Sequence, residues 1–321
     1  MLRYTAVFLS CLLAAAAAHA SDYPSRPVTL VVPGPPGGTP DVVARMVAEK
    51  LRARLGQPVI VENKAGASGF IGTAAVAKAA PDGYTVLMGF AQTMAVNPAT
   101  FKKLPYDPVQ DFTPIARLVD FELALAVPGS TPARNFPELL SWLRAGRGKY
   151  SYGSFGAATP SQFAGDMLNR KAGLDMQHVP YKGSQPGVQA LIANDVQLFI
   201  ASYGIVAGQI SAGRIRALAV AADQRLPALA QVPTTAEVGL PPGLILSNWW
   251  GIAAPKGTGK EIVDRLAEAF KRAVNDQDVQ RKFVEQGTLP VASSSQQFAD
   301  RMRDEAQSWK AIITKTGVTV E

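Results

Sequence analysis

Val28-Thr29-Leu30-Val31-Val32 is an apolar run typical of a buried strand, and Gly37-Gly38-Thr39-Pro40-Asp41 follows it closely in the chain. The pattern of residues 40–55 then predicts an amphipathic helix. Thr is a favourable N-cap, and Pro suits the first helical position because the N–H group that it lacks would be unpaired there. The stretch therefore predicts a strand, an open loop of small residues and a helix in succession.

A second stretch repeats this order. Gly156-Ala157-Ala158-Thr159-Pro160-Ser161 follows a predicted strand at 149–153 and precedes a predicted helix at 161–172. Small residues leave backbone N–H groups uncovered, and a helix N-terminus attracts anions through those groups and its positive dipole end. Two such loops could hold one carboxylate between them. The alternative is that Thr and Pro serve only to begin two helices.

The N-terminal segment resembles a secretion signal. Arg3 supplies the positive charge, residues 7–18 form an apolar core, and Ala18-His19-Ala20 fits the cleavage pattern. We expect cleavage near Ala20-Ser21 and a periplasmic mature chain. The alternative is a lipoprotein acylated at Cys11, although the sequence around that residue fits the lipoprotein pattern poorly.

Removal of residues 1–20 would leave 301 of the 321 residues, which is enough for two domains. It would also remove Cys11, the only cysteine, and leave His178 as the only histidine. The formal charge would fall from +7 to +6, with no arginine-rich run of the nucleic-acid-binding type. We therefore expect no cofactor, no metal site, no catalytic residues and no nucleic-acid partner, and a monomer is the default.

Short apolar runs alternate with helical patterns along the chain, which argues for mainly parallel sheets with helices on both faces. Further strands are expected at 58–62, 84–88, 114–118, 122–127, 176–181, 196–201, 215–221 and 245–254. Further helices are expected at 69–79, 136–145, 185–194, 205–212, 260–275, 278–286 and 295–314. Residues 97–112 are interpreted as a loop and residues 227–242 as a proline-rich connection.

Apolar segments near 118–125 and 245–254 are the best candidates for crossovers between two α/β domains. The predicted division is residues 21–120 plus 247–321 for domain 1 and residues 121–246 for domain 2. Ligands of such sheets bind beyond the carboxyl ends of the strands, where both Thr-Pro loops are expected to lie.

Several short motifs in a fixed order carry a resemblance to a known family. They are YPSRP (23–27), GGTPD (37–41), LGQPVIVEN (55–63), GASG (66–69), PDGYT (81–85), DF (111–112), HVPYKG (178–183), GRIRALAV (213–220), VPT (232–234), EVGL (237–240) and WG (250–251). With these motifs the chain resembles the Bug, or tripartite tricarboxylate transporter (TctC-like), family of periplasmic substrate-binding proteins. The resemblance covers essentially the whole mature sequence.

The resemblance implies an α/β type II periplasmic-binding-protein (Venus flytrap) fold, with a cleft between two domains. It also implies that residues 33–41 and 154–161 hold a small carboxylate, partly through waters, for delivery to the membrane permease subunits of a tripartite tricarboxylate-type transporter. The candidate ligand-binding residues are Gly38, Thr39, Asp41, Phe90, Ser154, Gly156, Ala158, Thr159, Ala201 and Tyr203. Two other functions remain open, namely a ligand-sensing co-receptor of a signalling system and an enzyme of the same fold.

Departures from the family pattern bear on the ligand. Gly34 stands where an aromatic residue is usual, Gln162 where His is common, and Ala201 where many members carry Asp. Phe90 replaces a small hydroxyl residue, and Tyr203 is expected near the same end of its sheet. These changes favour aromatic or apolar acids and argue against a ligand ammonium group.

Three aromatic residues outside the loops are expected to have structural roles. Trp249 and Trp250 are interpreted as packing or hinge residues, with stacking on a ligand as the alternative for Trp249. His178 is expected to make a structural polar contact. Asp41 is expected to complement the dipole at the start of its helix.

Overall fold

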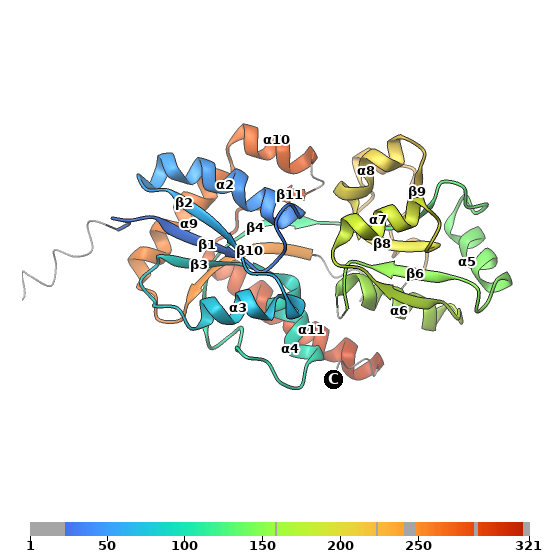
Figure 1. Ribbon diagram of the computed structural model, residues 1–321, viewed down its shortest axis with the longest axis horizontal. Helices are drawn as coiled ribbons and strands as arrows, with labels where there is room; N and C mark the ends of the chain where they lie inside the picture. Colours follow the sequence, from blue (N-terminus) through green and yellow to red (C-terminus); the bar gives the residue numbers. More distant parts are fainter. Residues whose placement is uncertain (1–22, 158, 223, 241–247, 286–287, 317–321) are drawn as a thin grey trace, which may run out of the picture.

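The computed structural model of the protein describes residues 23–157, 159–222, 224–240, 248–285 and 288–316. The predicted secretion signal, Cys11 and the candidate residue Ala158 lie outside those residues. The chain forms two lobes, each built around its own sheet and covered by helices (Figure 1). The fold is therefore α/β with two domains, as predicted.

The sheet of the first lobe has the strand order β11-β4-β10-β3-β1-β2. Its strands are β1 (Val28–Val32), β2 (Val59–Asn63), β3 (Thr85–Phe90), β4 (Phe112–Phe121), β10 (Asn248–Pro255) and β11 (Thr288–Pro290). Strand β1 pairs in parallel with β2 and β3, whereas β10 pairs antiparallel with β3 and β4, and β11 antiparallel with β4.

The sheet of the second lobe has the order β7-β6-β8-β5-β9. Its strands are β5 (Leu123–Pro128), β6 (Ser151–Ser154), β7 (Gln177–Pro180), β8 (Leu198–Ser202) and β9 (Ile215–Ala221). Strand β6 is parallel to β7 and β8, but β5 is antiparallel to β8 and β9. Both sheets are therefore mixed, but their strands run mainly in one direction, as predicted. In the first sheet β10 and β11 oppose the other described strands, and in the second sheet β5 does.

Strands β5 and β10 run against their neighbours because each follows a segment of the other lobe. Strand β5 comes directly after β4, with only Glu122 between them, and starts where the parallel strands of its new sheet end. A strand that enters at this edge must run back against its neighbours. Strand–helix alternation along the sequence carries no signal for such an entry.

Helices cover both faces of each sheet. Where a helix was predicted, its observed ends lie within about three residues of the predicted ends. They are α2 (Thr39–Leu55), α3 (Phe70–Ala77), α4 (Asn97–Thr100), α5 (Phe136–Ala145), α6 (Pro160–Lys171), α7 (Ser184–Ile192), α8 (Tyr203–Ser211), α9 (Lys260–Val274), α10 (Gln277–Glu285) and α11 (Ser295–Thr316). Three short turns complete the described elements: η1 (Ala67–Gly69), η2 (Gln92–Val96, a π-helical turn) and η3 (Pro227–Leu229).

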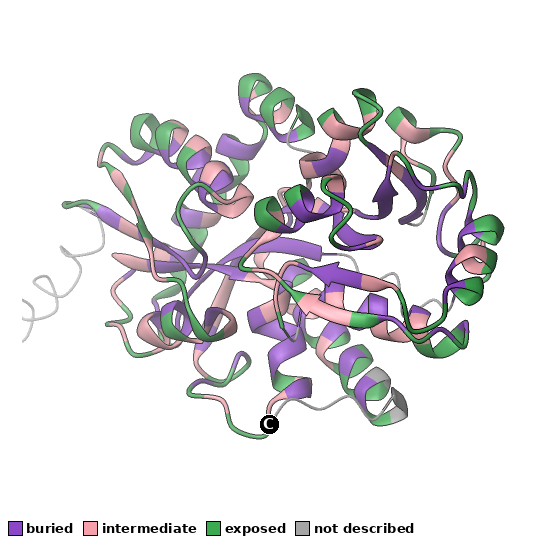
Figure 2. Ribbon diagram, turned by 45° about the vertical axis from the view of Figure 1, so that its right-hand side comes forward, coloured by how far each residue is buried: buried purple, intermediate pink, exposed green. Residues whose placement is uncertain are grey.

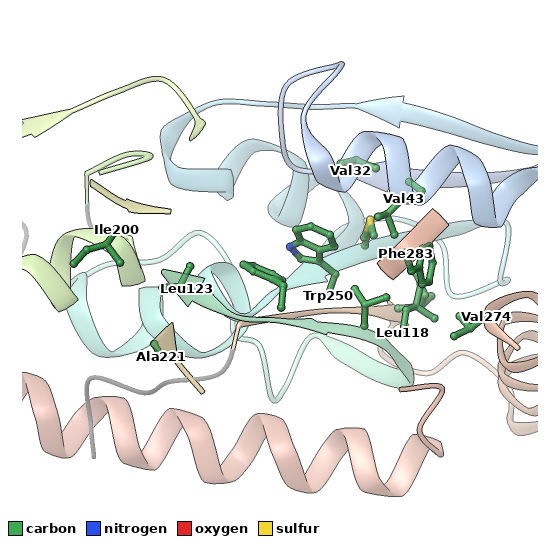
Figure 3. Close-up of a cluster of buried hydrophobic side chains, with 14 of the residues drawn as sticks. Val32, Val43, Leu118, Leu123, Ile200, Ala221, Trp250, Val274 and Phe283 are labelled. Atoms are coloured by element: carbon green, nitrogen blue, oxygen red, sulfur yellow. The ribbon is translucent and has the colours of Figure 1, made fainter. Parts of the chain in front are cut away.

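The core follows the two-residue period of the strands. In β1, Leu30 and Val32 pack in one apolar cluster with residues of α2 and α9, while Val31 packs on the opposite face with residues of α3 and α11. Figure 2 shows the buried strands and the exposed outer faces of the helices. The larger cluster continues from the first lobe through Trp250 and Leu123 to Ile200 in the second (Figure 3).

The described crossover between the lobes lies at Glu122, within the segment predicted for it. The Tyr203 N–H donates to the Glu122 carbonyl oxygen at 2.9 Å, so the crossover is tied to the end of β8. The second predicted crossover, near 245–254, lies partly outside the described part of the chain. The exact domain limits therefore stay a prediction.

Candidate functional site

Both predicted loops lie at the sheet edges where the chain crosses between the lobes. Strand β10 is antiparallel to β3 and to β4, so β4 runs in the direction of β1 and ends at the same edge. Strand β5 starts at the crossover and is antiparallel to β8, so β6 and β8 end there too. Residues 33–41 after β1 (the first loop) and 154–161 at the end of β6 (the second loop) are thereby brought to the crossover.

Helix α2, which follows the first loop, begins one residue earlier than predicted. Gly38, not Thr39, is the N-cap of α2, with an extended backbone (φ −72°, ψ 161°), and Thr39 and Pro40 occupy the first two helical positions. Neither the Thr39 hydroxyl nor its backbone N–H has a hydrogen-bond partner among the described residues. Both groups therefore remain available to a ligand.

Asp41 is only 4% exposed and belongs to the support of the first loop. Its carboxylate accepts from the Gly37 N–H at 2.9 Å and forms an ion pair with Arg45, also at 2.9 Å. Burial opposes ionisation, but the hydrogen bonds from Arg45 and Gly37 outweigh it and hold the pKa of Asp41 below its usual value. Arg45 also donates to Asn63, whose amide donates to the Gly34 carbonyl oxygen. Asp41 thus fixes the loop through its own helix.

The second loop has the predicted cap. Thr159 is the N-cap of α6, its hydroxyl oxygen accepts from the Gln162 N–H at 3.3 Å, and Pro160 is the first helical residue. The Thr159 hydroxyl donates to the Gly156 carbonyl oxygen at 2.7 Å, and the Ser154 hydroxyl donates to the same oxygen at 2.8 Å. Both hydroxyl protons are therefore used inside the loop.

His178 contacts this loop, in agreement with a structural polar role. Its Nε2 lies 2.8 Å from the Oγ of Ser154, a side chain with no exposed surface. The imidazole stacks on Tyr152, with ring centroids 5.0 Å apart, and Tyr152 donates to Asp166 of α6. Burial lowers the pKa of His178, and the nearby Asp166 opposes this only in part. The imidazole is therefore neutral near pH 7.

Backbone N–H groups are the remaining donors of the second loop. In the part of the loop that the structure describes, the N–H groups of Ala157 and Thr159 have no partner. They lie at the N-terminus of α6, where the helix dipole favours an anion. The contribution of Ala158 lies outside the described residues.

Aromatic side chains gather at the same edge of the first sheet. Phe90 ends β3 and is half-buried, and its ring lies near Trp250, at 6.3 Å between centroids. Trp250 packs against Phe121 at 4.6 Å. A Cβ atom added to Gly34 would lie 3.6 Å from the Phe90 ring. That distance is an ordinary van der Waals contact, so the Phe90 ring lies directly beside the first loop.

Two other candidates lie at the end of β8. Ala201 has no exposed surface and packs among apolar residues that include Phe199 and Val206. Tyr203 is the first residue of α8, half-buried beside the crossover. Between them, Ser202 is buried and its hydroxyl has no partner among the described residues. Sequence reasoning missed Ser202, since a lone Ser at a strand end carries no pattern.

Sequence reasoning also missed a third loop at this edge, after β2. Gly66, Ala67, Ser68 and Gly69 all have positive φ angles, of 124°, 46°, 53° and 85°. Left-handed backbone at Ala and Ser is costly and clusters at functional sites. A Cβ atom on Gly72 would lie 3.0 Å from the Cα of Pro33, so this loop and α3 pack directly on the first loop. The motif GASG was the available signal.

Trp249 has the packing role predicted for it. It has no exposed surface, meets Phe298 edge to face, and donates from its indole nitrogen to Glu305 of α11. The described residues include no group of three or more His, Cys, Asp or Glu side chains placed to hold a metal ion. The helices within the described ranges are all too short or too polar to cross a membrane.

Comparison with known proteins gives consistent matches over nearly the whole chain. The family model described as "Tripartite tricarboxylate transporter family receptor" matches residues 43–318. BugT of Bordetella pertussis is 33% identical over 322 residues, covering 100% of this chain and 98% of BugT.

Two solved structures of similar proteins hold carboxylic acids. R. palustris Rpa4515 with adipate has a TM-score of 0.86 and 32% identity, covering 93% of this chain and 99% of that one. MatC from Rhodopseudomonas palustris with bound malate has a TM-score of 0.83 and 33% identity, covering 91% of this chain and 100% of that one.

Proposed function

The chain belongs to the tripartite tricarboxylate transporter family of periplasmic solute-binding receptors, and we propose that it captures a small carboxylate and delivers it to the membrane subunits of such a transporter. The proposed mature protein begins near Ser21. The proposed domains are residues 21–120 plus 247–321 and residues 121–246, and the carboxylate is bound between them. The acids held by the two similar structures, adipate and malate, support this class of ligand.

One observation carries the proposal. Two helices of different lobes, α2 and α6, begin at the crossover edge with backbone N–H groups that lack partners within the described residues. Hydrogen bonds from neutral donors to a carboxylate are charge-assisted, so they are shorter and stronger than those between neutral groups. The helix dipoles add to the attraction at both ends. A carboxylate bridging Thr39 on one side and Ala157 and Thr159 on the other would draw the lobes together.

Neither loop directs a charged side chain at the proposed ligand, so binding depends on backbone N–H groups and on the Thr39 hydroxyl. Asp41 is engaged with Arg45 and Gly37, so its negative charge is neutralised next to the proposed site. The Thr39 hydroxyl is the available side-chain donor of the first loop. Closure by lobe rotation would then be driven by the ligand itself, as in other two-lobed binding proteins.

Binding rather than catalysis is the proposed activity, because the Ser154–His178 pair is arranged unlike a nucleophile and its base. The Ser154 hydroxyl proton goes to the Gly156 carbonyl oxygen, so His178 must donate to Ser154 instead of accepting from it. Ser154 is also fully buried. A catalytic Ser would need an exposed oxygen and an imidazole that accepts its proton.

The test is a thermal-shift screen of the chain from Ser21 onward against aliphatic, aromatic and amino carboxylates, with neutral and cationic compounds alongside. A ligand at 100 times its dissociation constant stabilises by about 2.7 kcal/mol, which shifts the melting temperature by several degrees. Stabilisation confined to carboxylates, and reduced by Thr39→Val, is the expected result. A protein stabilised by a neutral or cationic compound and by no acid would contradict the proposal.

Phe90 is the proposed determinant of ligand class, favouring acids with an apolar or aromatic body. We expect Phe90→Ser to narrow the preference for adipate over malate by about tenfold, because apolar contact area is lost. Phe90→Leu, which keeps apolar volume, should retain most of the preference. Isothermal titration with both acids gives the two affinities. An unchanged ratio in Phe90→Ser would remove Phe90 from the site.

A further inference from the structure

We propose that His178 is a positioning residue for the second loop: through Ser154 it fixes the orientation of the Gly156–Ala157 peptide and so aims the Ala157 N–H at the ligand. The inference rests on the proposed function of this loop in holding a carboxylate. His178 does not itself contact the backbone N–H groups proposed to bind the ligand, since Ser154 stands between them.

The hydrogen-bond directions follow from the number of protons available. A Ser hydroxyl has one proton, and the Ser154 proton is donated to the Gly156 carbonyl oxygen. The 2.8 Å contact between His178 Nε2 and Ser154 Oγ can then be a hydrogen bond only if Nε2 carries the proton. The imidazole is therefore the Nε2–H tautomer, and the chain runs from His178 through Ser154 to Gly156.

The carbonyl of Gly156 is held from two sides, because Thr159 donates to it as well. In a trans peptide the C=O and the following N–H point in opposite directions. A Gly156 carbonyl turned towards Ser154 and Thr159 therefore turns the Ala157 N–H away from them. That N–H has no partner among the described residues, as expected of a donor presented to a ligand.

The imidazole is itself held in place by β6 and α6. Tyr152 is the register partner of His178 in the parallel pair β6–β7, so the two rings lie on one face and stack at an interplanar angle of 25°. Tyr152 donates to Asp166, which also accepts from the Gln162 side chain at 3.3 Å. The face of Tyr152 lies against α6, where a Cβ atom on Gly165 would clash with the ring. Ser154, two residues on from Tyr152, shares this face.

The first experiment needs no ligand. His178 is the only histidine from Ser21 onward, so its imidazole nitrogens can be observed by ¹⁵N NMR without assignment. The expected result is the Nε2–H tautomer, with an N–H signal that exchanges slowly in the wild type and rapidly in Ser154→Ala. A dominant Nδ1–H tautomer would overturn the inference.

The second experiment measures affinity for adipate and malate in matched variants. His178→Phe keeps a ring to stack on Tyr152 but removes the donor, and we expect it to weaken binding about tenfold, the effect of one well-placed hydrogen bond. His178→Gln keeps an N–H donor and should restore most of the affinity. Ser154→Ala should weaken binding as much as His178→Phe, and the double variant no further, because the two residues act in series.

Val179→Ala is the matched control, since Val179 lies on the same strand but packs with the cluster on the opposite face. It should lower the melting temperature and leave the affinity unchanged. Equal affinity of His178→Phe and wild type, or equal losses in His178→Phe and His178→Gln, would overturn the positioning role. If the wild type binds neither these acids nor any other carboxylate, the proposed function fails, and the tautomer alone decides the inference.

Discussion

The stability that His178 contributes to the fold depends on pH, and the structure determines in which direction. Burial against Tyr152 lowers the pKa of His178 from its ordinary value of 6.5, and Asp166 opposes the shift. The unfolded chain therefore binds more protons than the folded one in the window below pH 6.5. The stability contributed by neutral His178 is complete above this value and falls as the pH drops through it.

We expect the wild type to lose more stability than His178→Gln between about pH 7.5 and about pH 5, because the variant lacks the titrating group. Urea unfolding at several pH values measures the difference, and carboxylates that titrate in both proteins cancel in the comparison. Parallel stability curves for the two proteins would show that His178 has the same pKa folded and unfolded.

The two Thr-Pro loops differ at the level of helix starts, although their sequences are alike. Thr159 caps α6 with its side chain, whereas in the first loop Gly38 is the cap and Thr39 is already helical. Asp41 accounts for the difference, since it binds the Gly37 N–H from the third helical position and so stabilises the earlier start.

We expect Thr159→Val to lower the free energy of unfolding by about 1 kcal/mol through loss of the cap. Thr39→Val should change it by less than about 0.5 kcal/mol, because the Thr39 hydroxyl makes no hydrogen bond within the described chain. Urea denaturation of the ligand-free variants checks both values. Equal losses would mean that Thr39 also serves as a cap.

The regular elements could be predicted from the sequence because their apolar residues follow a strand or helix period. Strand β11 has only three residues and η2 only five, too few to show a period. The direction of β5 depends on its entry from another sheet, which no local pattern records. The loops were located by their small residues, but the partner of Ser154 lies 24 positions away at His178. Contacts of that kind need the strand register.

Across the whole molecule, α11 joins the two lobes. Its Trp309 packs on Phe163 of α6, with ring centroids 5.4 Å apart, and both side chains are almost fully buried. Ala95, Val96 and Ile313 complete this cluster. Farther towards its N-terminus, α11 packs through Phe298 on Trp249 of the first sheet. Figure 1 shows α11 passing below the first sheet towards the second lobe.

We expect Phe163→Ala and Trp309→Ala each to cost about 3–5 kcal/mol in unfolding free energy, with a coupling of about 1 kcal/mol between them. A double-mutant cycle measured by urea denaturation gives the coupling. Phe298→Ala is the control, since Phe298 packs within the first lobe and should show no coupling to Phe163→Ala. Additive effects at Phe163 and Trp309 would mean that their contact is not maintained in solution.

The crossover at Glu122 and the loop ends lie between the two lobes, so the proposed acid would be bound close to the hinge about which the lobes close. A ligand bound close to the hinge moves little as the lobes close, but its size sets the angle at which closure stops. An acid with a longer chain would therefore leave the lobes wider apart at the ends that lie far from the hinge. A membrane partner that contacts both of these ends would respond to the length of the ligand without touching the ligand itself.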